Sequence, residues 1–454
     1  MKQPIQLNYG KPNLKKIMNT KKKILQITLG FQLLLLLLGC SSDDNDIEAP
    51  SGPMVNIPTL NEVITGDDFF RTANGDYIND YIDNYSTLFT REGSSTVSFN
   101  GPSTLLKQVV ELGGDLGSQV EVATIQLKFE GQNAQSAGFS DTSLNGTMEI
   151  VRFKTSSSIA QFGGFNSSGQ GQTNVSAIAA FIAGHQAVMD NWVSAAASGQ
   201  PGRFADSEGI TRHVDAKGRE LNQLFTKSLT GALAYDQAVN HYLNRLDDEN
   251  NGTGNYRTLN DEGTVVEGSS YTTMEHHWDE AFGCVYGNTL SQNLIYKYID
   301  DVDGLSKFAG TESDIFTAFV VGRIAIAEKD YATRDAQIGI LREKLGLIIA
   351  VRAVHHLSAA AKIIDAINGG GAGKREDAFH DISQGYGFVN SLRYLVNASG
   401  SRYFTDAEVN NYLMVLDVGN AFWDSTSTQL TDLANVIAAK GAGGLSWTPD
   451  DVHP

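Results

Sequence analysis

Proline placement is the feature of this sequence that most restricts its fold. The 454 residues contain nine prolines, and only Pro201 interrupts the span from residue 103 to residue 448. A proline inside a helix costs about 3 kcal/mol. This span can therefore hold a long succession of helices, and the spacing of its apolar residues indicates whether helices are present.

Four segments have apolar residues at three- and four-residue spacing: 175–198, 215–246, 314–367 and 406–440. This spacing is typical of amphipathic helices. Asp215 and Thr405 are suited to cap two of them, and the glycine-rich sequence after Ala366 predicts a helix end. We therefore predict a mainly α fold of helical bundles over residues 59–447. Its two halves, about 59–290 and 291–447, form either two packed bundles or one continuous domain.

The pattern of apolar and polar residues changes between Tyr85 and Gly171. Residues 95–99, 121–129 and 147–154 alternate apolar and polar side chains, and clusters of Gly, Ser and Asn separate them. Such alternation predicts short strands. A pack of helices with long glycine-rich loops fits the same residues, so both alternatives stay open here.

The N-terminus has the layout of a secretory signal. A basic stretch precedes an apolar run at 24–38, which is short for a bilayer span and contains polar residues, and a small residue comes directly before Cys40. The sequence Leu37-Leu38-Gly39-Cys40 resembles the lipobox of bacterial lipoproteins. That resemblance implies a signal peptide over residues 1–39, with its start at Met18 as the better choice, and acylation of Cys40 after cleavage.

Residues 40–58 are polar, acidic and interrupted by prolines, which predicts a flexible tether. An acidic run after a lipidated cysteine resembles the signal that sends some lipoproteins to the outer face of the outer membrane, although a plain solvated linker fits as well. We expect a protein anchored in the outer membrane by its lipid, at the cell surface or facing the periplasm.

The charge of the chain excludes one class of partner. Residues 1–39 hold seven lysines and no acidic residue, so the chain from Cys40 has 27 basic and 52 acidic side chains, a net charge of −25. Such a surface repels nucleic acid. Only Cys284 remains besides Cys40, so no intrachain disulfide is expected.

The segment "YTTMEHHWDEAFGCVYG" at 271–287 concentrates the metal-binding residue types of this sequence. On a helical wheel an apolar stripe faces inward, and it consists of Met274, Trp278, Ala281, Phe282 and Val285. His277 lies on one flank with Glu280 beyond it, while His276 points away. His277 and Glu280, at i and i+3, can direct a nitrogen and an oxygen to one point, as metal sites in helical bundles do.

An imidazole with a carboxylate suits iron, zinc or manganese, but two donors make half a site. Glu376 and His380, at i and i+4, form a second pairing on one face, and Gln384 extends that face. If the two halves pack together, His380 is the preferred partner of the first pair. His276 completes the candidate metal ligands.

A plainer interpretation of the same segment needs no metal. In it His277 bridges within the bundle or pairs with Glu280, and Glu275, Asp279 and Glu280 are solvated. Elsewhere, His185 lies on an apolar stripe and is expected to be a hydrogen-bonded core histidine. His355 and His356 are adjacent on a helix, so a metal shared between them is not expected.

Five stretches, 212–237, 271–287, 321–335, 351–357 and 379–395, together resemble a family of uncharacterised bacterial lipoproteins of about this length. That family is similar in layout to the imelysins, two-bundle helical proteins of iron-related operons that carry a Gly-x-His-x-x-Glu motif and were once classed as metallopeptidases. His277 to Glu280 matches the His-x-x-Glu part, whereas Glu275 stands where the imelysin motif has glycine. The resemblance implies a role in iron or haem acquisition at the cell surface.

Two functional hypotheses follow. The favoured one is a non-enzymatic lipoprotein that binds iron, zinc, haem or an iron carrier, or docks onto an outer-membrane receptor. The alternative is a metal-dependent hydrolase in which His277 holds the metal and Glu280 acts as the base. The sequence contains neither a Gly-x-Ser-x-Gly elbow nor a His-Glu-x-x-His pair, so standard serine hydrolase and zincin mechanisms are not expected.

Overall fold

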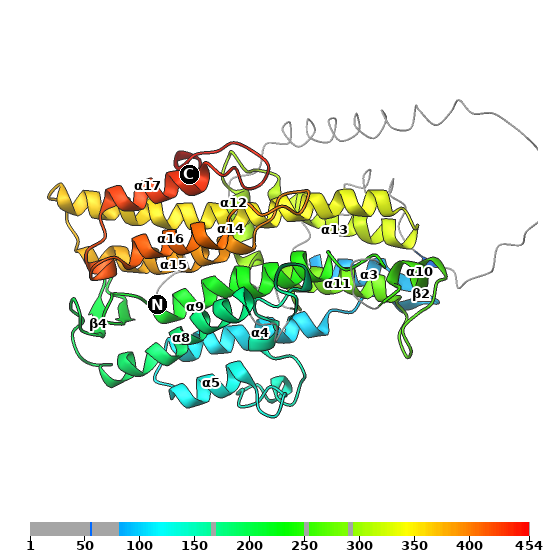
Figure 1. The fold of residues 1–454 in the computed structure, drawn as a ribbon, viewed down its shortest axis with the longest axis horizontal. Coiled ribbons are helices and arrows are strands. Elements are labelled where there is room, and N and C mark those ends of the chain that lie inside the picture. Colours follow the sequence, from blue (N-terminus) through cyan, green and yellow to red (C-terminus); the bar gives the residue numbers. More distant parts are fainter. Residues whose placement is uncertain (1–54, 57–80, 165–168, 249–253, 289–293, 454) are drawn as a thin grey trace, which may run out of the picture. The chain divides into compact units, whose positions relative to one another are not determined.

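Helices dominate the computed structural model (Figure 1). The structure describes residues 55–56, 81–164, 169–248, 254–288 and 294–453. It is 61% helical with few short strands, which confirms the prediction of a mainly α fold. The predicted signal peptide, Cys40 and nearly all of the predicted tether lie outside the described residues.

The α-helices in chain order are α3 (Tyr81–Leu88), α4 (Asn100–Leu116), α5 (Val122–Glu130), α6 (Val151–Lys154), α7 (Ile159–Phe162), α8 (Gln170–Asp190), α9 (Leu221–Leu229), α10 (Tyr256–Asp261), α11 (Thr273–Tyr286), α12 (Ile299–Asp303), α13 (Thr311–Ala327), α14 (Tyr331–Asn368), α15 (Phe379–Ser391), α16 (Asp406–Asp417) and α17 (Ser427–Ala438). A π-helix, η3 (Thr230–Tyr242), continues α9. Short 3-10 helices are η2 (Thr142–Leu144), η5 (Tyr296–Tyr298), η6 (Arg375–Ala378), η7 (Leu392–Tyr394), η8 (Ala421–Trp423) and η9 (Pro449–Val452).

The strands of the described residues form two small antiparallel sheets. One has β1 (Val55–Asn56), β2 (Thr90–Arg91) and β3 (Ser94–Ser95) in that order. The other is the hairpin of β4 (Gly202–Ala205) and β5 (Thr211–Val214), in which Gly202 pairs with Val214.

The 38-residue helix α14 is the central element of the bundle, and it packs against α13, α15 and α17. Among the described residues it is the one helix long and apolar enough to cross a membrane, but 72% of its apolar window is buried inside the protein. A buried apolar helix of this kind is what the core of a helical bundle requires.

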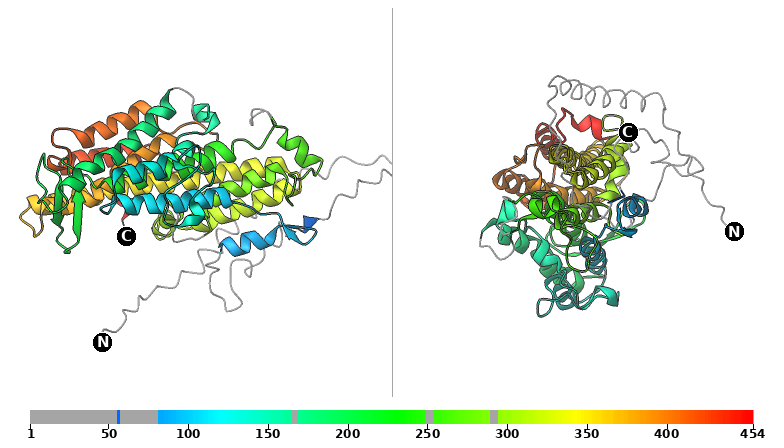
Figure 2. Two further views of the ribbon diagram at one scale, coloured as in Figure 1. Left: turned by 90° about the horizontal axis from the view of Figure 1, so that it is seen from below. Right: turned by 90° about the vertical axis from the view of Figure 1, so that its right-hand side faces the viewer.

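The helices after residue 294 form one layer and those before residue 288 form another (Figures 1 and 2). Both layers belong to one compact unit, residues 53–454. The two layers meet closely where α13 crosses α11. A Cβ on Gly322 would lie 2.1 Å from the Trp278 ring, so only glycine allows this approach. Whether the two predicted halves are separate domains stays a prediction.

The predicted helix over 215–246 begins later than expected, and the prediction of Asp215 as its cap is wrong. The Asp215 carboxylate accepts the backbone N–H groups of Lys217 and Arg219 at 2.8 and 3.0 Å, and Gly218 has φ of +82°. This closes a turn after β5, and α9 starts only at Leu221. Local side-chain bonds of aspartate favour turns as well as caps.

The other predicted helices are present with breaks. The 314–367 segment is two helices, because Lys329 adopts φ of +61° and Asp330 caps α14 through the N–H of Thr333. Thr405 caps α16 as predicted, with Glu408 completing a capping box. The helix predicted over 175–198 ends at Asp190, and the chain of 406–440 is divided between α16 and α17.

The strand alternative for 85–171 is wrong over most of its length. Residues 121–129 and 147–154 contain α5 and α6, and the strands in this region are the two-residue β2 and β3. Ile125 and Phe129 are both fully buried and one helical turn apart, so the residues that reach the core follow a helical spacing. The alternative of helices joined by long loops describes this region better.

Candidate functional site

Helix α11 carries the histidine-rich segment, and its start is fixed by a capping box. The Thr272 hydroxyl accepts the N–H of Glu275, and the Glu275 carboxylate accepts the N–H of Thr272 at 2.7 Å. The predicted apolar stripe is confirmed, since all of its members are fully buried: Met274, Trp278, Ala281, Phe282 and Val285.

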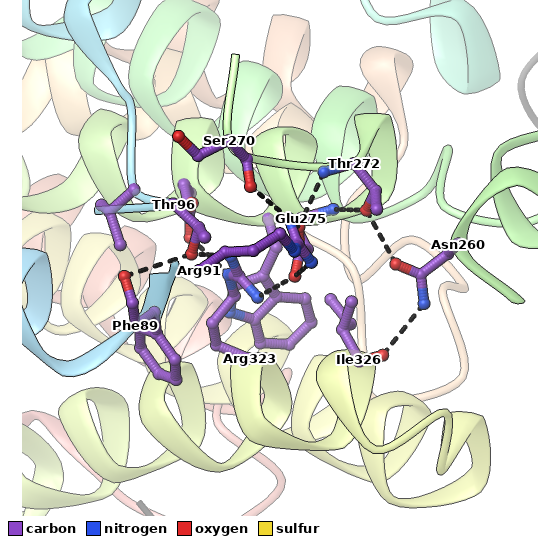
Figure 3. A network of polar contacts seen from close by, with 12 residues as sticks. Phe89, Arg91, Thr96, Asn260, Ser270, Thr272, Glu275, Arg323 and Ile326 are labelled. Atoms are coloured by element: carbon purple, nitrogen blue, oxygen red, sulfur yellow. Dashed lines mark hydrogen bonds and ion pairs between the residues drawn. The ribbon is translucent and has the colours of Figure 1, made fainter. Parts of the chain in front are cut away.

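One side of α11 takes part in a buried ion network formed by Arg91, Glu275, Asp279 and Arg323. Figure 3 shows Arg91, Glu275 and Arg323 of this network. Arg91 from β2 binds Glu275 through two nitrogens at 3.1 Å each. Arg323 from α13 lies between the two acids, 3.1 Å from Glu275 and 3.0 Å from Asp279. The prediction that Glu275 and Asp279 are solvated is wrong, because two arginines distant in the sequence neutralise them inside the core.

The remaining polar atoms of this network are largely paired. Arg323 donates to the Thr96 hydroxyl at 2.9 Å, and the Tyr85 hydroxyl donates to Asp279 at 2.8 Å. Burial raises the pKa of Asp279 to about 7, with Arg323 and Tyr85 acting against it. Burial also raises the pKa of Glu275, but the effects of Arg323, Thr272 and Arg91 lower it by more. The pKa of Glu275 therefore lies below its usual range. These side chains are buried, with Arg91 the most exposed at 9%, and their ion pairs join β2, α11 and α13.

The other side of α11 is partly open. His276 Nε2 lies 3.5 Å from Glu280 Oε1, and the two side chains are 26% and 16% exposed. The Nδ1 atom of His276 lies 3.1 Å from the carbonyl oxygen of Ser98, and its ring stacks on Tyr271. The structure thus brings Glu280 together with His276 at i and i+4.

His277 has a different environment from the predicted one. The edges of its ring meet Tyr242 and Tyr256, with centroids 5.7 and 4.8 Å apart. Its Nδ1 is buried without a hydrogen-bond partner, and no hydrogen bond or ion pair joins it to Glu280 in the described structure. Burial, reinforced by the charge of Arg245, lowers the pKa of His277 to about 4. It is therefore a neutral imidazole at neutral pH.

Residues from other elements complete the group that we call the α11 polar cluster: Glu149, Lys154, His241, His276, His277 and Glu280. Lys154 Nζ lies 3.4 Å from Glu149 Oε2. The Glu149 and Glu280 carboxylates both approach Gly101 near the start of α4, since a Cβ there would lie 3.1 and 3.4 Å from their Oε1 atoms. Sequence reasoning missed Glu149, Lys154 and His241, because nothing in the sequence places α6 and η3 beside α11.

Burial shifts the pKa of Glu280, His277 and His241 in this cluster. It raises the pKa of Glu280, against His276, Lys154 and Tyr242. It lowers the pKa of His241 to about 3, and Nδ1 of His241 is also buried without a hydrogen-bond partner. Cys284 is buried beside these groups with its pKa raised, so its thiol is protonated and unreactive.

His380 and Glu376 are not brought to α11. His380 Nδ1 lies 3.0 Å from both Glu220 Oε1 and Arg212 Nη1, and its Nε2 meets Gln384 at 2.9 Å, as the i,i+4 spacing predicts. Glu376 lies in η6, ahead of α15. Of the residues in the described ranges, no three His, Cys, Asp or Glu side chains are placed to hold one metal ion. His276 and Glu280 therefore form a contact of two such side chains without a third beside them in the described ranges.

Three further histidines have hydrogen-bond partners within the protein. His185 is fully buried and its Nε2 meets the Ser118 carbonyl oxygen at 3.0 Å, which confirms it as a hydrogen-bonded core histidine. His355 Nδ1 meets the Val452 carbonyl oxygen at 3.0 Å, while His356 Nδ1 meets Asp381 at 2.8 Å. The two adjacent histidines thus have separate partners.

A family model described as a domain of unknown function (DUF4856) matches residues 84–442. The chain belongs to this family. The matched range includes the buried ion network and the α11 polar cluster, so both are parts of the DUF4856 domain. No curated protein and no solved structure matches the chain.

Proposed function

We propose that this DUF4856 protein is a non-enzymatic lipoprotein of the outer membrane, anchored through Cys40, that binds iron held by a small carrier. One observation carries the ligand part of the proposal: His276 Nε2 and Glu280 Oε1 lie 3.5 Å apart on the open side of α11. The lipobox-like sequence supports the anchor, and the similarity in layout to the imelysins of iron-related operons supports the choice of metal.

The chemistry of the pair supports this choice. Imidazole nitrogen and carboxylate oxygen are both ligands for iron. Adjacent ligands at bond lengths of about 2.1 Å lie roughly 3 Å apart, close to the separation of His276 and Glu280. Gly101 places no side chain against Glu280, and Lys154 of the same cluster pairs with Glu149 and not with Glu280.

The number of donors favours a chelated ion over a bare one. Two protein ligands leave most positions of a six-coordinate iron to other donors, and the described part of the chain offers no third one at this point. A carrier with its own oxygen donors fills those positions. This arrangement binds and releases a complex, and it assigns Glu280 the role of a ligand and not that of a base.

Calorimetric titration of the acylated full-length protein in detergent with ferric citrate tests the proposal. We expect saturable binding, and a loss of at least tenfold in affinity in His276→Ala and in Glu280→Gln. His453→Ala, a histidine at the C-terminus outside the cluster, serves as the matched control with unchanged affinity. Circular dichroism verifies that each variant is folded.

Equal binding in all variants would refute the assigned ligands, and no binding by the wild type would refute the carrier-bound iron. Cleavage of a peptide that depends on Glu280 would replace the proposal with the hydrolase alternative. The anchor is tested separately: Cys40→Ser should abolish metabolic labelling with an alkyne fatty acid and release the protein from the membrane fraction. Protease treatment of intact cells then distinguishes the surface from the periplasmic face.

A further inference from the structure

A second candidate site lies beside the π-helix η3. A cavity of about 370 Å³ is lined by polar side chains from separate elements, among them Gln161, Asn240, Asn244, Arg342 and Arg402. Its volume is within the range of small-molecule sites, about 300 to 1,000 Å³. None of these residues belongs to the α11 polar cluster, so this cavity is independent of the proposed iron site.

Arg342 differs from the other polar residues that line the cavity in its hydrogen bonds and its ion pairing. It donates to the Ala398 carbonyl oxygen at 3.0 Å and to the Asn244 side-chain oxygen at 3.1 Å. Its Nε is buried without a hydrogen-bond partner, and no acidic side chain of the described residues forms an ion pair with it. Because arginine has five N–H donors and stays charged, Arg342 retains unused donors and an uncompensated positive charge.

The other arginine of the wall is already neutralised. Arg402 pairs with Asp406 at 2.6 Å and also donates to the Gln161 oxygen at 3.3 Å. Glu343, the acid next to Arg342 in sequence, accepts the Ala398 N–H at 2.7 Å and the Tyr403 hydroxyl at 2.5 Å. Of the two arginines in the cavity wall, Arg342 is therefore the one without an acidic ion-pair partner among the described residues.

Hydrogen bonds to the surrounding protein fix the side-chain amide of Asn240 in the cavity wall. Asn240 Nδ2 donates to the Tyr394 carbonyl oxygen and to Asp236, both at 3.1 Å. Asp236 is fully buried and also accepts from Ser157 and Ser158, so its charge is satisfied away from the cavity. Asn240 lies in the last turn of the π-helix, a conformation that is rare and is often found at functional sites, and Asn244 lies in the turn that follows it.

We propose that this cavity binds a small hydroxylated carboxylate of about monosaccharide size. The carboxylate pairs with Arg342 through the unused N–H groups of its terminal nitrogens, because a guanidinium fork matches the two oxygens. The side-chain amides of Gln161, Asn240 and Asn244 bind hydroxyl groups. Arg342 thereby sets the requirement for a negative charge, and the amides set the requirement for hydroxyls.

Calorimetric titration of the acylated full-length protein with D-glucuronate, and with D-glucose as the same ring without a carboxylate, tests the proposal. We expect saturable binding of glucuronate and at least tenfold weaker binding of glucose. Arg342→Gln should weaken glucuronate binding at least tenfold. Arg257→Gln, which replaces a half-exposed arginine outside the cavity, should leave the affinity unchanged.

Asn244→Asp provides a second variant that retains an acceptor for Arg342 and neutralises its charge. Asn244→Asp should also lose glucuronate binding, and it tests the role of Arg342 if Arg342→Gln does not fold. The proposal is overturned if wild-type protein does not bind glucuronate, if glucose binds equally well, or if folded Arg342→Gln and Asn244→Asp both retain the wild-type affinity.

Discussion

The two charged faces of α11 both carry acidic side chains, but these side chains have different surroundings on each face. On one face Glu275 and Asp279 are at most 1% exposed, and Arg91 and Arg323 pair with them. On the other face Glu280 and His276 reach solvent, and His277 has a buried nitrogen without a hydrogen-bond partner. Asp279 lies four positions after Glu275, and Glu280 lies four positions after His276, so spacing alone does not distinguish the faces.

The difference shows what decides the role of a charge in a helical bundle. A buried carboxylate is tolerated when it is paired and hydrogen-bonded, and it then holds neighbouring elements in register. A carboxylate whose protein partners are few and whose surroundings are partly open can exchange those partners for a ligand. The following three predictions test this contrast, from the largest expected effect to the smallest.

Arg323→Met should destabilise the protein by about 3 to 5 kcal/mol, because it leaves two buried carboxylates without their shared cation. Urea unfolding followed by circular dichroism measures the free energy of unfolding. The matched control is Arg257→Met, which removes a 48% exposed arginine and should cost less than about 1 kcal/mol. A similar loss of unfolding free energy in both variants would mean that the buried arginine contributes no more to stability than the exposed one.

His277→Gln should reduce the dependence of stability on pH. The pKa of His277 is about 4 when folded and about 6.5 when unfolded, so the unfolded chain binds the proton more tightly between these values. Its contribution is present above pH 6.5 and is lost as the pH falls toward 4, by up to about 3 kcal/mol. Unfolding free energies at pH 7 and pH 4.5 measure the change, and an unaltered slope in the variant would contradict the buried neutral imidazole.

Glu275→Gln and Glu280→Gln form a matched pair on one helix. The first should cost about 2 kcal/mol, because Glu275 accepts charge-assisted bonds from two arginines. The second should change stability by less than about 0.5 kcal/mol, since burial already disfavours the charged form of Glu280 and raises its pKa. Urea unfolding of both proteins at pH 7 measures the difference in unfolding free energy. A larger loss in Glu280→Gln than in Glu275→Gln would contradict the roles assigned to the two faces.

Much of the fold follows from local sequence. The proline-poor span and the apolar spacing predicted the helices, and Thr405 and the apolar stripe of α11 were predicted residue by residue. These features depend on backbone propensity, capping and periodicity, which act over a few residues. Asp215 was misplaced for the same local reason, since an aspartate bonds nearby backbone N–H groups in turns as readily as at helix starts.

The sites depend on residues far apart in the chain, and here the sequence alone was insufficient. It identified α11 as a concentration of histidines and acids, and it placed His276, His277 and Glu280 on one helix. Only the tertiary structure determined that Arg91 and Arg323 neutralise Glu275 and Asp279, that His276 is the partner of Glu280, and that Arg342 faces a cavity without an acid. A helical wheel gives the direction of a side chain, whereas its charge partners are supplied by whichever elements pack against it.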